Sequence, residues 1–148
     1  MTTETSQRVT LDSLVSNEFA FEINGERVGG VLHIGGLVTF HLHEDGKRLM
    51  PPFEVAKIVE REAGTPFNRW LRETLDGRQE INRPRREVTI VAVDDGVVTR
   101  RWTAHNAWIQ EVRYSSFDSA SFDMVAETFV IAYDDMEDSW PASSQADA

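Results

Sequence analysis

Apolar and polar side chains alternate along much of the chain from Phe19 onward, which is the pattern of half-buried β-strands. Phe19, Phe21 and Ile23 occupy every second position, and the dipeptide Asn24-Gly25 follows directly. Asn-Gly accepts the positive φ angles of a type I′ turn, so this segment predicts a β-hairpin.

A second hairpin is predicted around the turn signal Asp94-Asp95-Gly96, between the strands Glu87 to Val93 and Val97 to Trp102. Both faces of the first strand carry apolar side chains, so the sequence leaves open which face meets the core. Further strands are expected within the glycine-rich stretch Gly29 to Phe40 and at Phe53 to Val59. The paired glycines predict bulges or close backbone approach and not a phosphate-binding loop, because neither pair leads into a helix.

One short helix is predicted, at about Pro66 to Leu75. Thr65 suits the N-cap position, Pro66 suits the first helical position, and Gly77 ends the pattern. The side chains expected to face the core recur at helical spacing: Phe67, Trp70, Leu71 and Leu75. Several strands with a single helix predict a mainly β fold, a sandwich or barrel with the helix packed on it.

The composition fits one globular domain and limits its chemistry. We place the domain at residues 18–138, after an N-terminal arm at 1–17 that is partly disordered and before a disordered tail at 139–148. Cysteine is absent, which leaves no disulfide framework and no thiolate nucleophile. The N-terminal segment reads neither as a signal peptide nor as a membrane span, so a soluble cytoplasmic protein without membrane anchoring is expected.

The net charge of -10 at pH 7 repels phosphate backbones, so tight binding of nucleic acid is not expected. One basic cluster interrupts the acidic sequence, with Arg83, Arg85 and Arg86 around Pro84. It has no interleaved aromatic residues, and we interpret it as a solvated loop or an inter-subunit salt-bridge patch.

Candidate catalytic and metal-binding patterns are weak. His41 and His43 lie at His-x-His spacing, with His33 nearby, which is the start of the ligand pattern in cupin-like metal barrels. The glutamate that such a site needs near Lys47 or Arg48 is missing. No metal, cofactor or enzymatic activity is therefore expected.

The second half of the chain carries a family resemblance. It runs from Asn106-Ala107-Trp108 through a small-residue turn, Ser119-Ala120-Ser121, to the strand that contains Ala126-Glu127-Thr128. With the first hairpin and the bend at Gly35-Gly36-Leu37, these segments resemble, in the same order, the phage tail tube family, which the inner tubes of contractile injection systems share. The resemblance spans Phe19 to Tyr133 and depends on the order of its segments.

The resemblance implies a structural subunit and not an enzyme. Such subunits form hexameric rings that stack into a tube, with strands of all subunits joined into one barrel around a lumen. The implied partners are further copies of the chain, sheath subunits, a baseplate hub or spike, tube-end proteins and effector cargo, within a phage tail or injection system assembled in the cytoplasm. An acidic lumen would let polyanionic cargo slide without sticking. The side chains expected in the core are Phe21, Trp70, Leu71, Trp102, Trp108 and Phe129.

One segment departs from the family pattern. Phe40 to Pro52 is short and lacks the glycine-rich, tyrosine-containing sequence common in the family's stacking loop. A tube-end adaptor or initiator ring is therefore the alternative to a main tube subunit, ahead of a baseplate binding module or a metal-binding cupin-like barrel. The contacts within or between rings are expected at His41, His43, Glu44, Asp45, Lys47 and Arg48, and at Arg83, Arg85 and Arg86.

Overall fold

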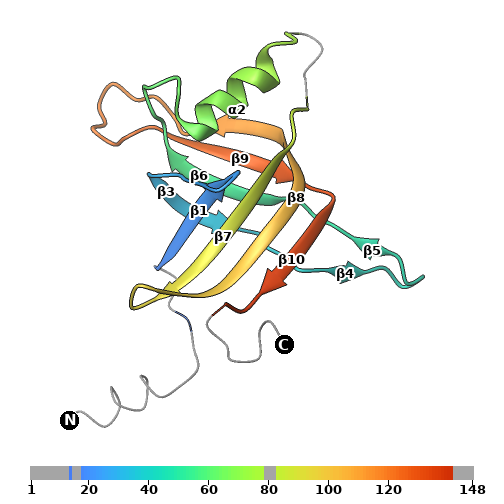
Figure 1. Cartoon of the computed structure of the whole chain (residues 1–148). Helices are drawn as coiled ribbons and strands as arrows, with labels where there is room; N and C mark the ends of the chain where they lie inside the picture. The colour runs from blue at the N-terminus through green and yellow to red at the C-terminus, as the bar shows by residue number, and fades with distance from the viewer. Residues whose placement is uncertain (1–13, 15–17, 79–82, 142–148) are drawn as a thin grey trace, which may run out of the picture.

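The computed structural model describes residues 14, 18–78 and 83–141 and shows a mainly β fold with a helix across one end (Figure 1). Most of the arm expected at 1–17 and of the tail expected at 139–148 lies outside these described residues. In chain order, the elements are β1 (Phe19–Ile23), β2 (Glu26–Arg27), β3 (Val31–Gly35), β4 (His41–Leu42), β5 (Arg48–Leu49), β6 (Phe53–Ile58), α2 (Pro66–Leu75), β7 (Arg86–Asp94), β8 (Val97–Tyr114), β9 (Ala126–Ala132) and β10 (Asp135–Ser139).

The strands form two layers that share one long strand. Layer A contains β2, β1, β7, the first part of β8 and β10, and layer B contains β3, β6, β9 and the last part of β8. All neighbouring strands in both layers are antiparallel. The short β4–β5 hairpin forms a separate two-stranded sheet and projects from the body (Figure 1).

Strand β8 passes from one layer to the other at Asn106. Its residues up to Ala107 pair with β7, and its residues from Trp108 onward pair with β9. Asn106 has a φ of 54°, in the left-handed region that asparagine tolerates better than most residues. The strand continues through this irregular position, so both layers are built on one backbone.

Both predicted hairpin turns are present. Asn24 and Gly25 have φ angles of 49° and 83°, and Asp95 and Gly96 have φ angles of 49° and 80°. Two successive positive φ angles are the signature of the type I′ turn that matches the twist of the flanking strands. In the second hairpin, Val88 and Ile90 face the core, but the opposite face of β7 is also buried at Val91.

Helix α2 covers the predicted range. Thr65 precedes it with extended backbone, but its hydroxyl donates to the Glu62 carbonyl oxygen at 3.4 Å and does not cap an amide of the helix. Leu75 is 52% exposed, so its assignment to the core is wrong. Thr74 is buried instead, because it lies two helical turns from Phe67 and on the same face, and its hydroxyl donates to the Trp70 carbonyl oxygen.

The core lies between the layers and beneath α2. Phe67 stacks on Phe21 of β1 with ring centroids 5.3 Å apart and on Phe129 of β9 with centroids 4.4 Å apart, so the helix joins both layers. Among the side chains expected in the core, Phe21, Trp70 and Phe129 are buried, and Leu71 and Trp102 pack against the same cluster while partly exposed.

Trp108, the remaining core candidate, lies outside this cluster. It pairs with Ala132 on the outer face of layer B, whereas its neighbours Ala107 and Ile109 are buried. The irregular backbone at Asn106 shifts the alternation of side chains, and the indole therefore points away from the core.

A buried ion pair links β6 to β9 in layer B. Lys57 has no exposed surface, and its ammonium lies 3.1 Å from Glu127 Oε1, which belongs to its direct cross-strand partner. The same ammonium lies 3.1 Å from Glu60 Oε1 and donates to the Ile58 carbonyl oxygen at 2.7 Å. Two charges are thus removed from water with several compensating contacts, which makes the pair costly to break from one side.

Tyr133, directly after β9, holds both ends of the segment that carries the β4–β5 hairpin. Its hydroxyl donates to the Pro51 carbonyl oxygen at 2.8 Å and lies 3.3 Å from the Val38 carbonyl oxygen. Burial raises the pKa of the Tyr133 hydroxyl, although the Arg48 cation opposes this, so the group remains a donor at neutral pH.

We predict that Glu127→Ala lowers the free energy of unfolding by about 3 kcal/mol, the low end of the cost of breaking a buried ion pair, because the buried Lys57 charge loses Glu127 and keeps the partly exposed Glu60. Chemical denaturation measures this loss. The double variant Lys57→Met with Glu127→Leu should recover most of it. The matched control is Glu54→Ala, which removes an exposed partner of Arg113 and should cost no more than about 1 kcal/mol. Equal losses in Glu127→Ala and Glu54→Ala would contradict the prediction.

Tyr133→Phe should loosen the projecting segment while the ring keeps its packing against Phe53, 5.8 Å away. Loss of the hydroxyl contacts is expected to cost about 1 kcal/mol, or roughly fivefold in local opening. Amide hydrogen exchange should accelerate over residues 38–51. Tyr114→Phe, at a 54% exposed tyrosine elsewhere, serves as the control and should leave exchange in this segment unchanged. Unchanged exchange in Tyr133→Phe would show that the hydroxyl does not hold the segment.

Candidate assembly surfaces

Layer B has an unpaired strand at each side. Strand β3 pairs with β6 on one side, and no described strand pairs with its other side. From Trp108 to Tyr114, β8 pairs with β9, and within the described residues its outer side is likewise unpaired. Unpaired backbone N–H and C=O groups at a sheet edge are a template for another strand. Layer B therefore offers two complementary places for pairing with further copies of the chain.

The outer face of layer B carries several small side chains among larger and charged ones. The strand registers place Gly35, Ala56, Thr128 and Ala132 on it. Arg113 of β8 reaches across β9 to Glu54 of β6 at 2.6 Å and also contacts Glu111 at 2.9 Å. Arg113 is paired with Thr128 and Glu54 with Val130, so the Arg113 side chain crosses β9 diagonally. One guanidinium thus faces two carboxylates on this part of the face.

The expected contact residues from His41 to Arg48 all lie on the projecting β4–β5 hairpin and are exposed. His43 Nδ1 lies 3.1 Å from Asp45 Oδ1, and the Lys47 amide donates to the same carboxylate, which shapes the turn. Arg48 connects the base of the hairpin to β10 through Asp135 at 3.2 Å. The remaining expected residues on this hairpin, His41 and Glu44, are also exposed.

The basic cluster is folded onto the chain itself. The guanidinium of Arg83 lies 4.8 Å from the centre of the Trp108 indole and that of Arg85 lies 5.6 Å from it. Arg86 forms an ion pair with Glu73 of α2, and burial, with a smaller contribution from the Arg69 charge, lowers the pKa of Arg86. Arg83 and Arg85 thus lie on the outer face of layer B, over Trp108, whereas Arg86 contacts α2.

The β8–β9 loop, residues 115–125, exposes three large apolar side chains. Phe122 is fully exposed, Phe117 is 83% exposed and Met124 is 71% exposed. The Asp118 carboxylate accepts a hydrogen bond from the Ala120 amide, and the Ser121 hydroxyl accepts one from the Asp123 amide. The loop is therefore shaped by its own polar contacts while its apolar side chains point to solvent. This surface was not predicted, because exposed apolar side chains in a loop follow no regular alternation of apolar and polar residues.

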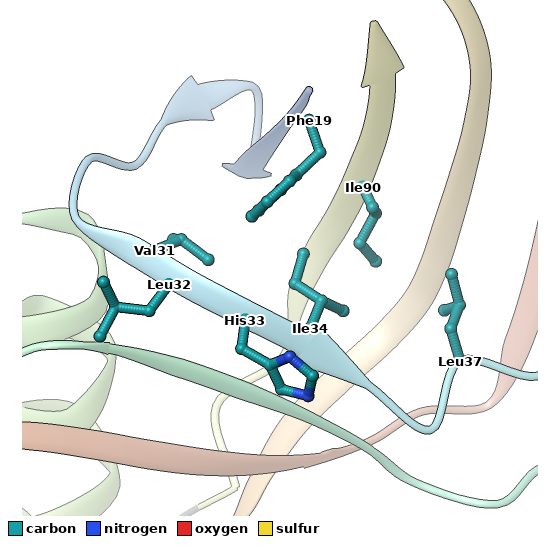
Figure 2. Close-up of a pocket in the computed structure, with 7 residues that line it drawn as sticks. All are labelled: Phe19, Val31, Leu32, His33, Ile34, Leu37 and Ile90. Carbon is teal, nitrogen blue, oxygen red and sulfur yellow. The ribbon is translucent and has the colours of Figure 1, made fainter. Parts of the chain in front are cut away.

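An apolar groove of about 710 Å³ opens between the free side of β3 and layer A. Figure 2 shows Val31 and Ile34 of β3 on the side of Phe19 and Ile90, with Leu32 and His33 on the other side of the strand. The strand has a bulge between Val31 and His33, which lets the consecutive residues Leu32 and His33 lie on the same side of it (Figure 2). Leu37 closes the far end of the groove.

The histidines do not form a metal site in the part of the chain that the structure describes, where no group of three or more histidine, cysteine or acidic side chains is arranged to hold an ion. His33 lies beside the groove, His43 contacts Asp45, and His105 contacts Glu137 at 2.8 Å on the outer face of layer A. Within the same residues, no helix has the length and apolar character needed to cross a membrane.

Three solved structures share this fold at low sequence identity. The tube-terminating cap of the anti-feeding prophage has a TM-score of 0.70 at 15% identity, covering 88% of this chain and 93% of that one. The sheath-tube complex of the extracellular contractile injection system PVC gives 0.62 at 17%, covering 92% and 97%. A chain of the six-fold symmetrised anti-feeding prophage baseplate gives 0.63 at 15%, covering 90% and 100%. At these identities, the likeness establishes the fold.

A comparison with curated protein sequences finds no match. The family model described as T4-like virus tail tube protein gp19 matches residues 15–137, which is most of the chain and contains every described strand except the end of β10. The match confirms the resemblance drawn from the order of the first hairpin, the bend at Gly35-Gly36-Leu37 and the segments from Asn106-Ala107-Trp108 to Ala126-Glu127-Thr128. The chain belongs to the family of T4-like virus tail tube proteins.

Proposed function

We propose that the protein is a ring-forming subunit of the inner tube, or of the tube end, of a contractile injection system or phage tail. The observation that carries the proposal is the pair of unpaired edges of layer B, β3 on one side and the end of β8 on the other. Free sheet edges are prone to pair with further strands, and a ring pairs both edges of every copy without leaving one free.

The order of strands in layer B suits such closure. Each strand is antiparallel to its neighbour from β3 through β6 and β9 to β8, so β3 and β8 run in opposite directions. Placing β8 of one copy beside β3 of the next keeps the antiparallel alternation unbroken around the ring. The contact is heterologous, head to tail, and closes when the rotation between copies divides a full turn. We propose six copies, in keeping with the family.

In this ring, the outer face of layer B lines the lumen and layer A with α2 lies outside. Small side chains such as Ala56 and Thr128 would line part of the wall, and Arg113 would pair there with Glu54 and Glu111. Arg83 and Arg85, over Trp108, would add positive charge that attracts polyanions, so free sliding of polyanionic cargo through an acidic lumen is not proposed. Sheath subunits would contact the outside of the ring, and the baseplate hub or spike would meet one end of the tube.

A tube-end ring is the second candidate, and one observation favours it. The β4–β5 hairpin has only two paired residues in each strand, so it offers little backbone for stacking one ring on another. Electron microscopy of the purified protein over a range of concentrations separates the two roles. Long tubes would establish a main tube subunit, and single or paired rings that do not grow would establish a tube-end role. A protein that remains a 16.8 kDa monomer under all conditions would contradict both.

Leu32→Lys should abolish ring formation, because it places a charge on the free edge of β3, where natural edge strands use lysine to prevent pairing. Leu32 is 56% exposed, so the fold should keep its stability to within about 0.5 kcal/mol. The matched control is Val97→Lys at a 57% exposed position in the β7–β8 hairpin, which should assemble normally. Light scattering measures the mass of each variant, and rings in Leu32→Lys would refute the assignment of this edge.

A further inference from the structure

The groove and the β8–β9 loop are complementary surfaces of one chain that do not meet within it. The groove presents apolar walls from Phe19, Val31, Ile34, Leu37 and Ile90. The loop presents Phe117, Phe122 and Met124 to solvent beside the opposite edge of layer B, where β8 ends. Exposed phenylalanines gathered in one loop are unfavourable in water and indicate a surface that another molecule covers.

The topology places the two surfaces at the same end of layer B. Backbone hydrogen bonds join Ile58 to Gly30, Val59 to Val125 and Ser115 to Ala126, so the start of β3, the end of β6, the start of β9 and the end of β8 lie in one row. The groove begins at this end, at Val31, and the loop leaves β8 at this end, after Tyr114. Each surface lies next to one of the two free edges.

Ring closure brings these surfaces together. When β8 of one copy pairs with β3 of the next, antiparallel alternation sets the end of β8 beside the start of β3, at a strand spacing of about 4.8 Å. The loop that follows Tyr114 then emerges beside the neighbour's Val31. The core-facing side of β8 at this point, with Val112 partly buried, is directed to the same side as the groove.

We propose that the groove of each subunit receives the β8–β9 loop of the adjacent copy in the ring, with Phe117 and Phe122 as the inserted side chains. The inference rests on the proposed ring and adds to it a side-chain contact outside the shared sheet. Backbone pairing alone carries little information about the partner, whereas a loop that fits a groove selects a second copy of this chain in one register.

Cross-linking tests the contact directly, because the chain contains no native cysteine. One preparation carries Val31→Cys in the groove and a second carries Phe122→Cys in the loop. After the two are mixed, dissociated and reassembled, a short bismaleimide reagent should give cross-linked dimers that neither preparation gives alone. A chain carrying both cysteines should give a ladder of higher multimers. The control pairs Phe122→Cys with Val97→Cys, in the hairpin at the opposite end of the body (Figure 1), and should give no cross-link.

The double variant Phe117→Ser with Phe122→Ser measures the contribution of the loop to assembly. Its rings should require at least about a tenfold higher protein concentration, since two large apolar side chains lose their buried contacts. Leu75→Ser, at another exposed apolar position on α2, should assemble as the unmodified chain does. Both variants should retain their unfolding temperature, because the substituted side chains are exposed.

The outcomes separate this inference from the ring itself. Rings of unchanged stability in the loop variant, without cross-links between Val31→Cys and Phe122→Cys, would overturn the inference and leave the proposed ring intact. A groove cysteine that cross-links within its own chain, to a cysteine introduced near the N-terminus, would also overturn it and assign the groove to the chain's own arm. Absence of rings from the unmodified protein would remove the proposed function and the inference together.

Discussion

The fold depends on one strand that serves both layers. Strand β8 pairs with β7 and β10 along its first part and with β9 along its last part, and the change occurs at Asn106. Because one backbone belongs to both layers, their relative position is fixed by covalent geometry as well as by packing. The pairing with β7 ends at Ala107, opposite Arg86, the first residue of β7, and the outer side of β8 is unpaired beyond that point within the described residues. The strand that joins the layers thus also provides one of the free edges proposed for assembly.

The interior supports this arrangement with both apolar and charged contacts. The aromatic stack of Phe67 with Phe21 and Phe129 attaches the helix to both layers, and the Lys57 and Glu127 pair fixes the register between β6 and β9. A one-residue slip of either strand would turn its charged side chain to the outer face and leave the other charge in the core without it. The same slip would move small outer-face residues such as Ala56 or Thr128 to the core face, so the pair also fixes which side chains layer B presents outward.

Much of the fold follows from the sequence, for physical reasons that particular residues illustrate. Asn24-Gly25 and Asp95-Gly96 predict their turns because few residue pairs accept two positive φ angles. The strand predicted at Phe53 to Val59 is confirmed, but the burial of Lys57 in it and its pairing with Glu127 were not predicted, because the sequence does not show which strand lies opposite. Strand β10 was not predicted, because Asp135-Met136-Glu137-Asp138 reads as an acidic tail. It forms because Met136 is buried and Asp138 contacts Arg100 at 2.7 Å.

The surfaces were harder to predict than the fold. The exposure of Phe117 and Phe122 depends on the path of a loop, and the groove depends on the distance between β1 and β3. No periodic pattern of apolar and polar residues reports either a loop path or a distance between strands. The basic cluster shows the same limit: Arg83 and Arg85 lie over Trp108, whose orientation follows from the irregular backbone at Asn106.

In the proposed ring, layer B closes into the wall of a lumen. A cryo-electron microscopy reconstruction of the assembled protein, at a resolution that separates strands, shows whether it does. We expect a ring in which β8 of each subunit lies antiparallel to β3 of the next and Ala56, Thr128 and Arg113 face the central hole. A ring lined by layer A or by α2, or a ring in which β3 and β8 remain unpaired, would contradict it.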